Sequence, residues 1–200
     1  MPKLIAAALV VLGVGLLSPL GAILFSAHMA QHLLLIAAAA PLLVWGGVNF
    51  RVPPLVGWAL FVCIFLFWHW PAAFQWAAQN PFGELLELSS ILAAAVALWS
   101  GVFGANTLGD GARALLVMTA AILTDLPGVV MLFAPRAICV MPQENAARFG
   151  LTPLQDQQIA GLLMWVPANL VFFGIATYLF ARWIGALPRS PGAACVPRSR

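Results

Sequence analysis

Long apolar runs that lack charged residues are the feature that most constrains the fold of this chain. Six of them, each near the roughly 20 residues that a helix needs to cross a bilayer, lie at about residues 4–20, 22–45, 54–70, 85–103, 112–133 and 154–181. Only 8% of the residues are charged, too few to cover a water-soluble globule. The runs are continuous rather than alternating, which excludes an outer-membrane barrel. We therefore expect an all-α, polytopic membrane helix bundle with about six transmembrane helices.

The breaks between the runs are short and rich in glycine and proline, so none of them divides the chain. We expect one transmembrane helical domain over residues 1–187 and a disordered cytoplasmic tail over residues 188–200. In the six-span arrangement, seven Lys and Arg residues lie on the side of the N-terminus, against Arg136 and Arg148 on the other side. Because basic residues favour the cytoplasm, both termini are expected there, and the basic residues require no nucleic-acid partner. The first run also has the pattern of a signal peptide, and its cleavage is the alternative to a first transmembrane helix.

All three histidines of the chain lie toward the outer ends of the expected helices. His28 and His32 are four residues apart, which places both imidazoles on one helix face, where they can bind a single metal ion. His69 lies at the outer end of the third expected helix, close to Pro71. The sequence thus indicates a metal site; the alternative is that the imidazoles are interfacial and bond to backbone carbonyls or water.

Two methionines are candidate soft ligands for the same ion. Met29 follows His28 directly, and Met164 lies two turns below Asp156 on the last expected helix. Nitrogen and sulfur donors suit copper(I) better than cations that prefer oxygen. Donor type alone leaves zinc open.

Acidic residues are scarce and their positions are informative. Asp125 lies near the bilayer midplane, where an ionisable side chain usually serves a proton relay or a structural hydrogen bond. Glu84 and Glu87 are expected to be first-turn acids that the helix dipole favours, and attraction of a cation at the helix mouth is the alternative. The chain carries no motif of a hydrolase, kinase or dehydrogenase, so we do not expect an enzyme.

Two segments resemble the membrane-integral CtaG family of cytochrome c oxidase assembly factors. They read HMAQH at residues 28–32 and DQQIAGLLMW at residues 156–165, and the resemblance runs from about residue 17 to residue 181. It implies a multi-pass protein of a bacterial inner membrane that helps to mature a haem-copper oxidase and takes part in copper delivery. Carried over by position, the motif residues are His28, Met29, Gln31, His32, His69, Asp156, Gln157, Gly161, Met164 and Trp165. The chain departs from the pattern in being short and in having the bulky Trp70 between His69 and Pro71.

We interpret the chain as a non-enzymatic assembly factor or metallochaperone. His28, His32 and His69 would form a copper(I) site, with Met164 or Met29 as the fourth ligand. The residues expected to support these ligands or to act in transfer are Asp156, Gln157, Gln31 and Trp165. The expected partners are the lipid bilayer, haem-copper oxidase subunits and a periplasmic copper carrier. Two alternatives stay open: a haem-binding membrane cytochrome that carries electrons, and an ion or proton transporter that uses Asp125.

Overall fold

Helices make up almost the whole of the computed structural model, which describes residues 2–13, 17–104, 108–138 and 143–186. In order they are α1 (Pro2–Val11), α2 (Ser18–Gly21), α3 (Phe25–Leu34), the π-helical turn η2 (Leu35–Ala39), α4 (Ala40–Trp45), α5 (Pro54–Trp68), α6 (Pro71–Ala78), α7 (Pro81–Phe103), α8 (Asp110–Phe133), α9 (Gln143–Ala147) and α10 (Pro153–Ala186). These residues contain no strand, which confirms the predicted all-α class. The tail expected over residues 188–200 lies outside the described residues.

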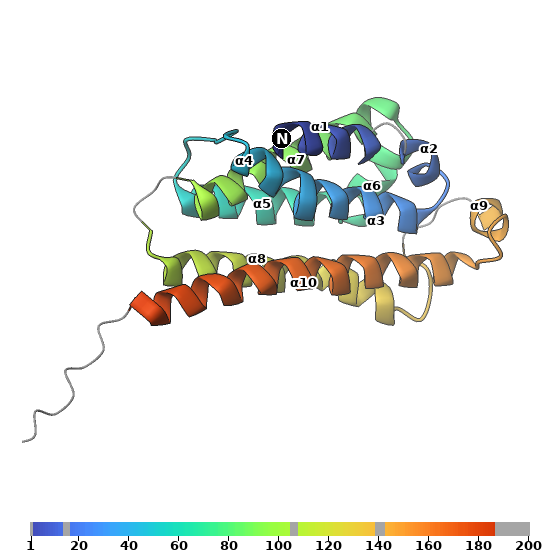
Figure 1. Cartoon of the computed structure of the whole chain (residues 1–200). Coiled ribbons are helices and arrows are strands. Elements are labelled where there is room, and N and C mark those ends of the chain that lie inside the picture. The colour runs from blue at the N-terminus through green and yellow to red at the C-terminus, as the bar shows by residue number, and fades with distance from the viewer. Residues whose placement is uncertain (1, 14–16, 105–107, 139–142, 187–200) are drawn as a thin grey trace, which may run out of the picture.

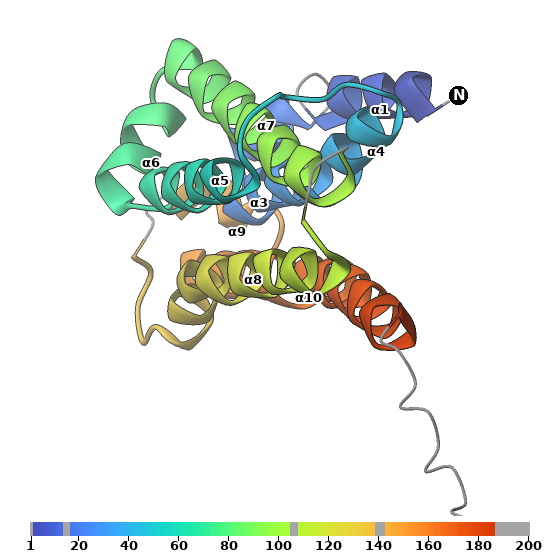
Figure 2. The same cartoon turned by 90° about the vertical axis from the view of Figure 1, so that its left-hand side faces the viewer.

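The helices pack as a pair against a larger group. α8 and α10 lie side by side along one face of the molecule (Figures 1 and 2). α3 and α5 lie between this pair and α7, which packs against α5 and α4. Because α7 is covered on most sides, small residues such as Ala94, Ala95 and Gly101 are buried along it. α3 and α5 thus form a middle layer, and side chains inside it are shielded by helices on both faces.

Four helical segments are long and apolar enough to cross a membrane: Phe25–Trp45, Pro81–Phe103, Asp110–Phe133 and Pro153–Ala186. A fifth exists if α5 and α6, which are bent by 73° relative to each other, form one span. The expected count of six is not confirmed among the described residues, because α1 has only 10 residues, about half the length that a bilayer requires. The placement of both termini in the cytoplasm assumed six spans, and it stays a prediction.

The span that carries His28 and His32 is interrupted by the π-helical turn η2. Pro41, at the start of α4, lacks the N–H that a regular helix would use at that position. The turn widens by one residue there, and the indole Nε1 of Trp99 donates to the carbonyl oxygen of Ile36 at 2.8 Å. A buried carbonyl is thereby satisfied from α7, which ties α7 to the segment directly after His32.

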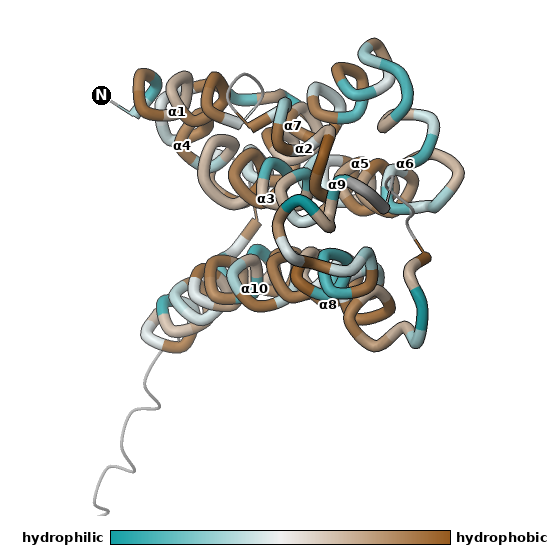
Figure 3. The backbone as a smooth tube through the Cα atoms, turned by 90° about the vertical axis from the view of Figure 1, so that its right-hand side faces the viewer, coloured by the Kyte–Doolittle hydropathy of each residue, from teal (hydrophilic) through white to brown (hydrophobic). Residues whose placement is uncertain are grey.

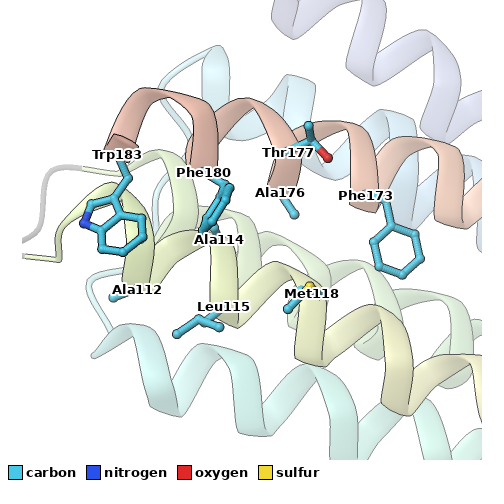
Figure 4. A pocket seen from close by; sticks show the side chains of 10 residues that line it. Ala112, Ala114, Leu115, Met118, Phe173, Ala176, Thr177, Phe180 and Trp183 are labelled. Atoms are coloured by element: carbon cyan, nitrogen blue, oxygen red, sulfur yellow. The ribbon is translucent and has the colours of Figure 1, made fainter. Parts of the chain in front are cut away.

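Much of α8 and α10 is brown in Figure 3, and large apolar residues such as Leu115, Val130 and Phe180 are exposed on them. Toward the start of α8 and the end of α10, a groove of about 600 Å³ separates their side chains (Figure 4). Leu115, Phe180 and Trp183 are among its lining residues, together with the hydroxyl-bearing Thr177. None of the metal ligands predicted from the sequence is among the described residues that line this groove.

Toward the other end of the pair, two glycines let α8 and α10 approach closely. A Cβ atom added at Gly161 would lie 2.6 Å from the carbonyl oxygen of Gly128, and one added at Gly128 would lie 3.1 Å from that of Gly161. Small residues allow such close backbone contact between membrane helices. This contact fixes where α10 lies beside α8.

We expect Gly161→Val to destabilise the protein by about 1–3 kcal/mol, because the added carbon atoms would push the two backbones apart. Gly174→Val is the matched control on the same helix, since a Cβ atom there meets nothing within 4 Å. The effect is measured as the melting temperature in detergent, which is obtained from the fraction of protein that stays monodisperse after heating. Equal melting temperatures for the two variants would contradict the close contact.

Candidate metal centre

Three buried side chains from two helices converge in the bundle. His28 and His32 of α3 and Glu87 of α7 bring potential ligand atoms within 4.8 Å of one another. The Oε1 atom of Glu87 lies 3.2 Å from Nε2 of His28 and 3.3 Å from Nε2 of His32. Donors bound at ordinary distances to one tetrahedral ion lie roughly 3.3 Å apart. The two separations from Oε1 of Glu87 therefore suit a single ion, and the shorter one is also that of a hydrogen bond between His28 and Glu87.

His69 adds a third imidazole from the break between α5 and α6. Its ring centroid lies 5.4 Å from that of His32. The Nδ1 atom of His69 donates to the carbonyl oxygen of Phe65 at 2.7 Å; since a carbonyl only accepts, Nδ1 carries the proton and Nε2 keeps its lone pair. That Nε2 atom is buried, with no hydrogen-bond partner among the described residues. A backbone bond of this kind fixes the tautomer in which metal-ligating histidines are commonly held.

Phe74 of α6 covers the cluster. Its ring meets His28 edge to face with centroids 5.5 Å apart, and it meets Phe25 in the same manner at 4.8 Å. Phe74 is 2% exposed. The bend after α5 thus places an apolar ring over the histidines and limits their contact with water.

Asp156, in the first turn of α10, holds the start of α3. Its carboxylate accepts hydrogen bonds from the backbone N–H groups of Phe25 at 2.8 Å and Ser26 at 3.1 Å, and from the Ser26 hydroxyl. Leu24, the residue before α3, has no side-chain oxygen with which to cap the helix. The carboxylate of α10 therefore caps α3 and fixes the position of His28 and His32. A further part of Asp156 in metal transfer stays a prediction.

The other polar residues of the two sequence motifs also make buried contacts. Gln31 donates to the carbonyl oxygen of Gly13 at 2.8 Å and to the Ser18 hydroxyl at 3.2 Å. Gln157 donates to the carbonyl oxygen of Met131 at 3.0 Å and accepts from the Ile138 N–H. The bonds of Gln31 join α3 to Gly13 and to α2, and those of Gln157 join α10 to the end of α8 and to the segment after it.

The remaining candidates lie around the cluster or away from it. Met29 and Met164 are buried and border a small cavity together with His32. The ring of Trp165 lies 6.4 Å from that of Phe133. Asp125 accepts a hydrogen bond from the Asn169 side chain at 2.9 Å, which joins α8 to α10.

Sequence reasoning named Glu87 as a first-turn acid, with attraction of a cation as the alternative, and the first-turn position is wrong. α7 begins at Pro81, where the Asn80 side chain accepts from the Phe82 N–H at 3.0 Å. Glu84 is the first-turn acid and accepts from the Ser18 hydroxyl at 2.7 Å, whereas Glu87 lies one turn deeper and is fully buried. The Asn-Pro pair is a common signal for a helix start, and it could have located Glu87 correctly.

We expect Asp156→Ala to lower the free energy of unfolding by about 2 kcal/mol, since the buried Phe25 N–H and the partly buried Ser26 donors would lose their acceptor. Asp110→Ala is the matched control, because Asp110 is also a first-turn acid but pairs with the exposed Arg182 at 3.1 Å. An exposed ion pair contributes less than about 1 kcal/mol. Thermal unfolding of both variants in detergent measures the difference, and equal losses of stability would argue against the buried cap.

Comparison with protein families identifies the family of the chain. The model of the family described as cytochrome c oxidase caa3 assembly factor (Caa3_CtaG) matches residues 47–186. The matched range includes His69, Glu87, Asp156 and Met164, whereas His28 and His32 precede it. No curated protein and no solved structure is significantly similar to the chain. Since the family match covers well over half of the sequence, the chain belongs to the Caa3_CtaG family of cytochrome c oxidase caa3 assembly factors.

Proposed function

We propose that the protein holds a copper ion, as cargo, during maturation of a haem-copper oxidase, and that His28, His32 and Glu87 bind it, with His69 as a further donor. The assembly role follows from the family. The copper part is our inference from the donor set. The proposal places the protein in a bacterial inner membrane, where oxidase subunits would receive the ion and a periplasmic copper carrier would supply it.

The observation that carries the proposal is an incompletely satisfied polar cluster in an apolar interior. The Oε2 atom of Glu87, the Nδ1 atom of His32 and the Nε2 atom of His69 are buried and have no hydrogen-bond partner within the described structure. Buried polar atoms that lack partners are costly. A cation bound among them would provide the missing interactions.

The donors themselves fit copper. Imidazole nitrogens suit copper and zinc, and a carboxylate oxygen shifts the preference toward divalent ions. Glu87 would also bring a negative charge that offsets part of the charge of the ion. The cluster that includes Glu87 therefore favours copper(II) over the copper(I) expected from histidines and methionines alone.

Each surrounding residue has a defined task in this proposal. The Nε2 atoms of His28 and His32 and Oε1 of Glu87 face one another, so they would bind the ion without a large rearrangement. Asp156 keeps α3 in place through the Phe25 and Ser26 N–H groups. Phe74 excludes water from the side of α6.

Metal content tests the proposal directly. We expect detergent-purified wild-type protein to retain close to one copper ion per chain after loading and desalting, and we expect Glu87→Gln and the His28→Ala, His32→Ala double variant to lose affinity at least about tenfold. Glu84→Gln is the control on the same helix, since Glu84 bonds to Ser18 instead of a histidine. Mass spectrometry for metals and electron paramagnetic resonance of copper(II) provide the readouts.

Two results would contradict the copper site. One is copper retention that is unchanged in Glu87→Gln and in the double histidine variant. The other is a visible haem spectrum in protein that takes up no copper, which would favour the membrane cytochrome. Oxidase activity in cells that lack the chain, restored by the wild type and by Glu84→Gln but reduced with Glu87→Gln, would link the site to assembly.

A further inference from the structure

A small cavity borders the histidine cluster on its side toward α8 and α10. Its volume is about 30 Å³, enough for one water-sized guest. Met29 and His32 line it from α3, and Met164 lines it from α10. Aromatic rings of α5 and α10 close much of the remaining wall. The cavity is therefore lined by two methionines and one histidine in an otherwise largely apolar enclosure.

The two methionines are held at the cavity by the packing of the helices. Met29 and Met164 are 1% and 7% exposed. Met29 and His32 are three residues apart on α3, which places them on one helix face. On the opposite side, the close contact at Gly128 fixes α10, because a Cβ atom there would lie 3.3 Å from the Cβ atom of Met164.

We propose that this cavity is a second ion site, for a soft monovalent cation such as copper(I), with Met29, Met164 and His32 as its donors. Thioethers select copper(I) and other soft ions. No carboxylate is among the described lining residues, so the donors are neutral and do not favour a divalent ion. Thr124, another polar lining residue, directs its hydroxyl to the carbonyl oxygen of Ala120 at 2.9 Å.

His32 links this site to the cluster that contains Glu87, and in this respect the inference rests on the proposed function. The Nε2 atom of His32 faces Glu87 at 3.3 Å, while its Nδ1 atom is buried and has no hydrogen-bond partner in the described parts of the chain. The imidazole of His32 is thus shared by two donor sets. One contains the carboxylate of Glu87, and the other contains the thioethers of the two methionines. The two sets differ in charge and in softness, so they match the two common oxidation states of copper.

Silver(I) and zinc(II) separate the two sites, because neither changes oxidation state during the measurement. The full chain is purified in detergent with Cys63, Cys139 and Cys195 replaced by serine, since thiolates bind silver. We expect Met29→Leu with Met164→Leu to weaken silver(I) binding at least tenfold and to leave zinc(II) binding unchanged. Met→Leu nearly conserves side-chain volume and is well tolerated in cores. Met118→Leu, on the exposed side of α8, is the matched control.

Glu87→Gln should give the opposite result, with weaker zinc(II) binding and unchanged silver(I) binding.

X-ray absorption at the silver edge of the wild-type chain should show sulfur neighbours that disappear in the double methionine variant. Silver(I) affinity that is unchanged in that variant, or the lack of sulfur neighbours in the wild type, would overturn the second site. An equal loss of silver(I) affinity in Glu87→Gln would also overturn it, because the two donor sets would then be one. Silver(I) binding at the methionines without any copper or zinc binding at Glu87 would support the second site and contradict the proposed function.

Discussion

A carboxylate buried in the middle of an apolar bundle is the constraint on which the rest of this structure depends. Removing a charge from water costs several kcal/mol, and in an interior only close polar partners offset that cost. The partners of Glu87 are the Nε2 atoms of His28 and His32, both within 3.3 Å of its Oε1 atom. α3 and α7 must therefore be held in a fixed register, because a shift of one turn would leave the carboxylate unpaired.

The fixed register has identifiable causes at several points. Asn80 and Pro81 set where α7 begins, and hence how deep Glu87 lies. Asp156 caps α3 from another helix, and the indole of Trp99 bonds to the widened turn after His32. These contacts come from three different parts of the chain and act on one centre. The candidate site is thus a product of the whole bundle rather than of a local motif.

Local patterns predicted the parts of this arrangement that depend on one helix. The spacing of His28 and His32 gave their common face, and the apolar runs gave an all-α membrane protein. The sixth span is not confirmed, because α1 has only 10 residues, and hydropathy did not reveal the 73° bend between α5 and α6. Glu87 was misplaced by one helical turn. The capping of α3 by Asp156 could not be inferred, since the periodicity of one segment does not show which acceptor another segment provides.

The cap that Asp156 places on α3 also sets an order of events during synthesis. Ser26 and Asp156 are 130 residues apart, and a ribosome produces the N-terminal partner long before the C-terminal one. Until α10 has inserted beside α8, the first turn of α3 lacks its acceptor and the cavity lacks Met164. The proposed donor set with the methionines is therefore completed only after α10 has been made, whereas His28, His32 and Glu87 are all synthesised before α8.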